Sequence, residues 1–182
     1  AAKIFERWDP ARKIAVQYWP QGEGGDLRMQ NPYWIAYRNP RNTDKKRYMA
    51  NVSIAFDILP WLNVSGRAKI DNTNSIFTQK LYASSNTTIT EGSTQGHYTE
   101  IRNTDEQIYA DVMVNINKTF ADNKFSLVAN VGASVNDTKS KELSYRGPIR
   151  EVGIPNMFTV FDLDKEKSRA QKYGWQEQTQ SI

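Results

Sequence analysis

The feature that most constrains this sequence is a strict alternation of apolar and polar residues, which is held through four separate segments. In the first segment, residues 48–57, Val52 and Ile54 occupy apolar even positions between polar odd ones. The other three segments cover residues 62–71, 108–117 and 125–136. Because successive side chains of a β-strand point to opposite faces, this pattern predicts strands that have one apolar face.

The predicted strands are longer than those of most soluble proteins. Each alternation holds for about ten to thirteen residues, whereas strands in globular proteins are commonly about five to six residues long. A strand of about twelve residues, with a rise of ~3.3 Å per residue and a tilt of ~45°, rises by ~28 Å along a bilayer normal. That rise spans the apolar band of about 25 Å in outer-membrane barrels, so the lengths favour a transmembrane β-barrel.

On this interpretation the two faces of the strands meet different surroundings. The residues predicted to face lipid are Val52, Ile54, Val64, Val112, Val114, Leu127 and Val131. The residues predicted to line the barrel interior are Asn63, Arg67, Lys69, Asp111 and Asn115.

The predicted connections alternate between short and long. Tight turns at residues 58–61 and 121–124 join the strands in pairs, whereas polar stretches at residues 72–104 and 138–172 are expected to be long loops. Outer-membrane barrels have short periplasmic turns and long extracellular loops, which assigns each rim of the predicted sheet. Four strands cannot close into a barrel, and both ends of the chain look like cuts within a longer protein, so we expect further strands outside this sequence.

Residues 1–46 are expected to form a further long extracellular loop region, and residues 47–182 the barrel segment. Four prolines interrupt any helix or central strand in the first region, yet its aromatic residues argue against a disordered linker. Flat rings stack on the apolar faces of sugars, which makes the loop aromatics candidates for ligand contact. The candidates are Trp8, Trp19, Tyr33, Trp34 and Tyr98. The alternative is that these rings pack the loops against each other or against a partner protein.

Composition excludes several other classes of protein. Hydrophobic residues make up 38 % of the chain, and no run approaches the ~18 apolar residues of a membrane-spanning helix. The chain carries a net charge of +4, but its 24 basic and 20 acidic residues are interspersed. We therefore expect no nucleic-acid partner, and the basic cluster 45–47 is interpreted as solvated. The absence of cysteine excludes disulfides and cysteine nucleophiles.

Catalytic chemistry finds little support in the sequence, and we expect that the chain is not an enzyme and needs no cofactor. The single histidine, His97, is predicted to be a solvated loop residue, and no second member of a catalytic set is near it in sequence. Residues 162–166 resemble half of a calcium loop but lack its glycine and its distal glutamate. We expect a charged loop or a short helix there and no metal.

Several short sequence motifs follow one another between about residue 28 and residue 182. They are Asn31–Asn39, Trp61-Leu62 with Gly66-Arg67, Gln79–Ser84, Asn115–Lys118, Tyr145–Glu151 and Gly174–Ser181. This set resembles the SusC/RagA family of TonB-dependent outer-membrane transporters. The TonB box, the plug domain and the final aromatic-ended strand of that family are not in this sequence.

The resemblance implies a fold, a location and partners. The fold would be a barrel of about 22 strands with a plug inside it, located in the bacterial outer membrane. It would import oligosaccharides or peptides with energy from TonB, which acts through the plug, and with a SusD-like surface lipoprotein as a lid. The alternative is a soluble β-sandwich that binds carbohydrate, in which a second sheet covers the apolar face. A surface enzyme domain is a third and weaker alternative.

Overall fold

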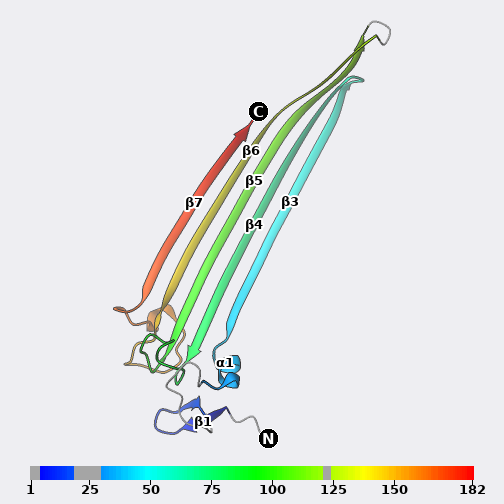
Figure 1. The fold of residues 1–182 in the computed structure, drawn as a ribbon. Helices are drawn as coiled ribbons and strands as arrows, with labels where there is room; N and C mark the ends of the chain where they lie inside the picture. Colours follow the sequence, from blue (N-terminus) through cyan, green and yellow to red (C-terminus); the bar gives the residue numbers. More distant parts are fainter. Residues whose placement is uncertain (1–4, 19–29, 121–123) are drawn as a thin grey trace. The chain divides into compact units, whose positions relative to one another are not determined.

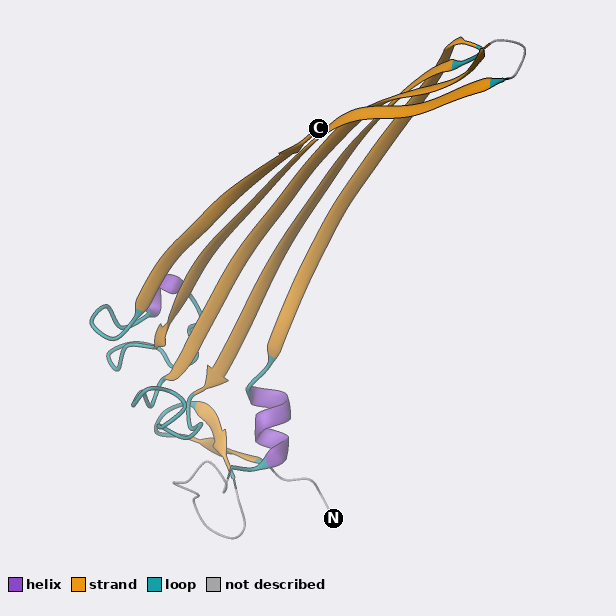
Figure 2. Ribbon diagram, turned by 45° about the horizontal axis from the view of Figure 1, so that its top comes forward, coloured by secondary structure: helices purple, strands orange, loops and turns teal. Residues whose placement is uncertain are grey.

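The computed structural model describes residues 5–18, 30–120 and 124–182 of the chain (Figure 1). It contains a small hairpin, one short α-helix and an antiparallel sheet of five long strands. The strands follow the order β3-β4-β5-β6-β7, so each strand lies beside its neighbour in the sequence (Figures 1 and 2). The prediction of long antiparallel strands is confirmed, and the sheet is open, with β3 and β7 at its edges.

The elements have the following bounds. The hairpin is formed by β1 (Glu6–Asp9) and β2 (Ile14–Gln17), and the helix is α1 (Pro32–Arg38). The five long strands are β3 (Arg41–Leu59), β4 (Leu62–Tyr82), β5 (Gly96–Phe120), β6 (Phe125–Pro148) and β7 (Arg169–Ser181). A single turn of 3₁₀ helix, η2 (Val160–Asp162), precedes β7. Among the described residues, no helix has the length and apolar character that a bilayer crossing requires.

The strands extend well beyond the segments that the alternation marks. The prediction of loops was wrong for most of residues 72–104 and for both ends of residues 138–172. The connection between β4 and β5 is only residues 83–95, and the one between β6 and β7 is residues 149–168. These extensions are mostly polar and their few apolar residues, such as Ile76, Phe77 and Leu143, do not alternate, so the apolar period disappears while the backbone pairing continues. For the same reason, the sequence did not predict β7.

The chain divides into two compact units. Unit 1 comprises residues 1–44, 75–102 and 142–172, and unit 2 comprises residues 45–74, 103–141 and 173–182. Buried apolar residues are found in unit 1 only, as far as the described residues go: Val16, Trp34, Leu81, Ala83, Tyr98, Ile149 and Leu163. In the described part of unit 2 there are only strands and their turns, which form a single layer.

The helix α1 begins at a well-formed cap. Asn31 is the N-cap, and its side-chain oxygen accepts a hydrogen bond from the backbone N–H of Tyr33 at 2.9 Å. Pro32 follows at the first helical position, where its missing N–H has no intrahelical partner to lose. The same asparagine donates its side-chain amide to the carbonyl of Tyr18 at 2.9 Å. The cap therefore also joins the helix to the segment that follows β2.

Trp34 fastens the helix to the loop of residues 83–95. Its side chain is fully buried, and its indole N–H donates to the hydroxyl of Ser85 at 2.9 Å. That hydroxyl in turn donates to the side-chain oxygen of Asn39 at 3.0 Å. The loop satisfies its own polar groups through short side chains, as when the Thr90 hydroxyl donates to the carbonyl of Ser93 at 2.7 Å. A polar stretch can therefore be buried and ordered without an apolar pattern.

Candidate functional site

The first candidate surface is the polar face of the sheet in unit 2. Side-chain hydrogen bonds cross it between adjacent strands: Asn63 accepts from Asn115 at 3.1 Å, and Asp111 accepts from Arg67 at 2.9 Å. Lys69 lies 3.7 Å from Asp71, which also accepts from Arg47 at 2.8 Å. All of these residues have odd numbers in β3, β4 and β5, so they share one face of the sheet.

The five residues predicted to line a barrel interior are therefore brought together on this polar face. β6 joins through its even positions, because Gln107 donates to the side-chain oxygen of Asn136 at 2.9 Å. Arg47 pairs with Asp71 and Arg67 with Asp111 across adjacent strands, and such opposite-charge pairs stabilise the sheet locally. That the face lines a lumen or contacts a plug stays a prediction.

The second candidate surface is the opposite, apolar face of unit 2. Val52, Val112 and Val131 are 56 %, 48 % and 61 % exposed, and Ile54 and Leu127 are about equally open. Val64 and Val114 are partly covered by their neighbours. The seven residues predicted to face lipid thus share one face, and in the described residues no second sheet covers it.

The apolar face has a sharp boundary on the side of the long connections. The last apolar residues on the four strands are Tyr48, Ile70, Ile108 and Val135, and the next residues on the same face are Lys46, Asn72, Glu106 and Asp137. Two of them form side-chain hydrogen bonds: Asn74 donates to Asn72 at 2.7 Å, and Gln176 donates to Asp137 at 3.0 Å. The face therefore changes from apolar to polar within two residues on each of these strands.

Aromatic rings mark the other boundary, beside the turns. Phe56 and Trp61 flank the turn between β3 and β4, and Phe120 and Phe125 flank the turn between β5 and β6. The ammonium group of Lys118 lies over two of these rings, at 4.3 Å from the centroid of Trp61 and 5.3 Å from that of Phe120. Aromatic rings and a cation thus gather at this end of the apolar face.

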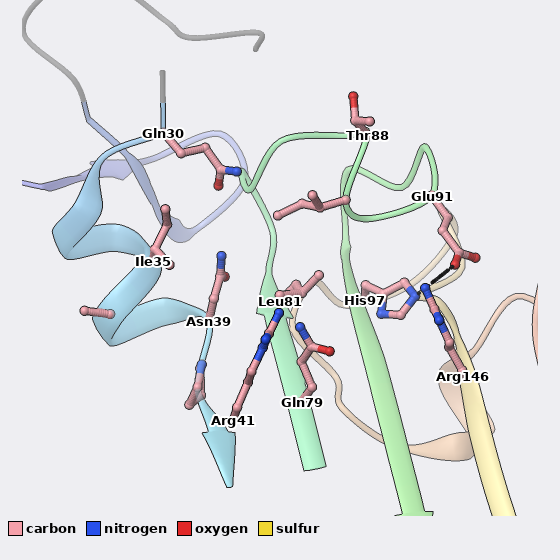
Figure 3. A pocket seen from close by; sticks show the side chains of 13 residues that line it. Gln30, Ile35, Asn39, Arg41, Gln79, Leu81, Thr88, Glu91, His97 and Arg146 are labelled. Atoms are coloured by element: carbon pink, nitrogen blue, oxygen red, sulfur yellow. Dashed lines mark ion pairs between the residues drawn. The ribbon is translucent and has the colours of Figure 1, made fainter. Parts of the chain in front are cut away.

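The third candidate site is a cavity of about 890 Å³ within unit 1 (Figure 3). Residues of α1 and the segment after it form one wall, and the 83–95 loop and the ends of β4, β5 and β6 form the others. The polar side chains that line the cavity are Gln30, Asn39, Arg41, Gln79, Thr88, Glu91, His97 and Arg146. Its volume lies in the range of about 300–1,000 Å³ that is common for ligand sites.

A histidine, a glutamate and an arginine meet at one side of this cavity (Figure 3). The Nε2 atom of His97 lies 3.6 Å from Oε1 of Glu91, and the guanidinium of Arg146 lies 3.4 Å from the same oxygen. Burial holds the pKa of His97 below its usual value, and Arg146 acts in the same direction while Glu91 opposes both. The imidazole is therefore neutral at physiological pH and presents one donor and one acceptor.

His97 is thus a correction to the sequence-based expectation. The sequence predicted a solvated loop residue. In the structure His97 is only 2 % exposed, and it is the second residue of β5. The neighbouring glycine explains the burial, because Gly96 has a φ of +116° and a side chain at that position would collide with the carbonyl of Leu81. The backbone can therefore pass close to β4 and carry the histidine inward.

Of the aromatic residues predicted to contact ligand, the four that the structure describes do not line the cavity. Trp8 is 65 % exposed on β1, and Tyr33 is 40 % exposed on α1, with its ring 6.5 Å from that of Phe5. Trp34 and Tyr98 are buried, and burial and the hydrogen bond from its hydroxyl to Glu100 raise the pKa of Tyr98 to about 12. Trp19 lies outside the described residues. For Trp34 and Tyr98, the structure matches the alternative in which rings pack the loops.

The acidic segment 162–166, predicted to be a charged loop or short helix, begins at the last residue of η2 and is otherwise irregular. Asp162 accepts from Arg150 at 2.8 Å, and the side chain of Asp164 accepts from the backbone N–H of Glu166 at 2.9 Å. Within the described ranges, no group of three or more histidine, aspartate or glutamate side chains is arranged to hold a metal ion.

Comparison with known proteins assigns the chain to no family. No protein-family model matches the chain, and no curated protein matches it.

Proposed function

We propose that the chain is a segment of a TonB-dependent outer-membrane transporter of the SusC/RagA type, which imports oligosaccharides or peptides. The observation that carries the proposal is the two-faced single sheet of unit 2. One face is an exposed apolar surface with the predicted lipid-facing residues, and the other is a charged, hydrogen-bonded surface. A bilayer on one side and a water-filled or plugged interior on the other match both faces.

The dimensions of the apolar face support a bilayer as its partner. On β3 the run from Tyr48 to Ile58 covers ten steps, and on β6 the run from Phe125 to Val135 covers ten as well. At ~3.3 Å per residue and a tilt of ~40°, such runs rise by ~25 Å, which matches the apolar band of outer-membrane barrels. The soluble sandwich alternative requires a second sheet of comparable size on this face.

The open edges of the sheet support a larger assembly. Backbone groups on the outer sides of β3 and β7 have no further strand beside them within the described residues. In a membrane such unpaired groups are very costly, so the proposed barrel closes through strands outside this chain. The plug that engages TonB and the SusD-like lid are likewise proposed as partners from the sequence resemblance, and the chain itself is proposed to be non-enzymatic.

These 182 residues contain no cysteine, so a cysteine introduced here is unique within them, and any cysteine elsewhere in the polypeptide would first be replaced by serine. In the complete polypeptide, Val131→Cys and Ser134→Cys would each be labelled with an environment-sensitive fluorophore and placed in vesicles of brominated lipid. These positions lie on opposite faces of β6. The proposal expects strong quenching of the label at Val131 and little at Ser134. Equal quenching, or none at either position, would contradict it.

A further inference from the structure

The cavity of unit 1 contains buried polar atoms that have no hydrogen-bond partner within the described residues. They are Oε1 of Gln30 and both ring nitrogens of His97, of which Nε2 lies 3.6 Å from Oε1 of Glu91, just beyond hydrogen-bond distance. The side chains are 5 % and 2 % exposed, so bulk water does not reach them freely. Buried polar atoms are nearly always satisfied in native proteins, which indicates that a bound molecule completes this site.

The orphaned atoms define the groups that such a molecule must offer. Gln30 presents an acceptor and needs a donor, whereas a neutral His97 presents one donor and one acceptor. A hydroxyl group donates one hydrogen bond and accepts two, so it can serve either residue. The Thr88 hydroxyl and the Asn39 amide add further polar groups to the lining. A ligand with several hydroxyl groups therefore fits these walls.

The charges around the cavity add a second requirement. Its lining contains two arginines, Arg41 and Arg146, but only one carboxylate, Glu91, which already lies close to both Arg146 and His97. In the part of the chain that the structure describes, Arg41 forms no ion pair. In the amide orientation that satisfies both groups, its guanidinium donates instead to the neutral oxygen of Gln79, at 3.1 and 3.2 Å. The lining thus has an excess of one positive charge, which a carboxylate on the ligand would balance.

Arg41 is an exposed residue whose Nε and Nη2 groups donate to Gln79, which leaves the Nη1–Nη2 edge of its guanidinium to bind a carboxylate. A guanidinium binds a carboxylate through two parallel hydrogen bonds, which fixes the orientation of the bound acid as well as its charge. Apolar side chains complete the walls, namely Ile35, Leu81 and Ile89, together with Ala36 and Pro40. Such surfaces suit the C–H faces of a sugar ring better than a small inorganic anion.

We propose that this cavity binds an acidic saccharide of the uronic-acid type, with its carboxylate on Arg41 and its hydroxyl groups on Gln30 and His97. The inference rests on the proposed transport function for its biological role, because it names the class of molecule that would be imported. Binding itself depends only on unit 1 and can be measured without transport.

The test uses the complete polypeptide in detergent and isothermal titration calorimetry. The probes are a uronic-acid disaccharide and the neutral disaccharide obtained when its carboxyl groups are reduced to hydroxymethyl groups. We expect saturable binding of the acidic probe and at least tenfold weaker binding of the neutral one. Arg41→Gln should abolish the preference for the acidic probe. Arg41→Lys keeps the charge but cannot form two parallel hydrogen bonds with a carboxylate, so it should retain part of that preference.

Two further variants separate the roles of the residues. Arg169→Gln removes an exposed arginine at the start of β7 that does not line the cavity, so it should leave both affinities unchanged. Gln30→Met should weaken the binding of both probes by a similar factor. It removes the amide that would bind a ligand hydroxyl and leaves Arg41 in place. Near-ultraviolet circular dichroism of each variant checks that unit 1 remains folded.

The proposal is overturned if the acidic and neutral probes bind equally well, if neither binds saturably, or if Arg41→Gln leaves the preference intact in a folded protein. Water alone as the occupant of the cavity would give the second of these results. Binding of the acidic probe together with absent lipid quenching at Val131 would leave this site in place and reject the membrane assignment. The two proposals therefore fail separately.

Discussion

Two neighbouring residues on β5 provide a sharp test of the membrane assignment. Val112 and Met113 are both exposed, at 48 % and 39 %, but consecutive residues of a strand lie on opposite faces. Val112 is also central, four residues from Ile108 and four from Ile116 on the apolar face. At ~3.4 Å per residue and a tilt of ~40°, each end of that run lies ~10 Å away along the normal, so Val112 would lie near the bilayer midplane.

An arginine at the midplane of an outer-membrane barrel costs about 2–4 kcal/mol when it faces lipid, and about 0–1 kcal/mol near the interface. Val112→Arg should therefore lower the folding equilibrium constant by about 30- to 1,000-fold. Ile108→Arg, at the edge of the apolar run, should cost about 0–1 kcal/mol. Met113→Arg, on the polar face beside Asp111, should cost less than about 1 kcal/mol.

The measurement is the free energy of folding of the complete polypeptide into lipid vesicles, obtained by urea titration and read from the mobility of the folded form in gels. The comparison of Val112→Arg with Met113→Arg controls for the general effect of a new arginine on β5. The reasoning is refuted if Val112→Arg and Met113→Arg cost the same, because a sheet with water on both faces would treat the two substitutions alike.

Three further predictions concern unit 1 and are measured by thermal unfolding of that unit. Trp34→Phe should destabilise it by about 1–3 kcal/mol, because the buried hydroxyl of Ser85 loses its donor; an unchanged melting temperature would contradict this. Gly96→Ala should cost at least about 1–3 kcal/mol, since its Cβ would lie 2.6 Å from the carbonyl oxygen of Leu81 at a φ of +116°. Because the pKa of His97 is lowered in the folded state, the unfolded state binds more protons as pH falls below about 6.5. Stability should therefore fall on acidification through that window, and His97→Gln should flatten the profile, whereas an equally steep profile would assign the effect to other groups.

The sheet was largely predictable from local pattern. Alternation over the four segments placed the cores of β3, β4, β5 and β6, and it assigned Val52 and Asn63 to opposite faces before any coordinates were known. This succeeds because side-chain direction in a strand follows from position alone. Where apolar and polar residues do not alternate the same signal is absent, which is why the strand ends and β7 were missed.

The cavity was not predictable, because its residues come from five separate parts of the chain. Gln30, Arg41, Glu91, His97 and Arg146 have no common spacing, and only the folding of the 83–95 loop over the strand ends brings them together. The aromatic residues were the more visible signal in the sequence, yet Trp34 and Tyr98 pack the loops. A burial pattern cannot be read from a polar loop whose side chains hydrogen-bond to each other.

The sequence by itself determined the strand direction, the two faces and the length of the apolar run, because each of these depends on neighbours a few residues apart. Tertiary structure alone decided which polar side chains are buried and which remain without partners. That decision depends on contacts between residues distant in the chain, such as His97 with Glu91 and Arg146. The chemistry of the proposed ligand follows from those contacts, and the proposed membrane location follows from the alternation.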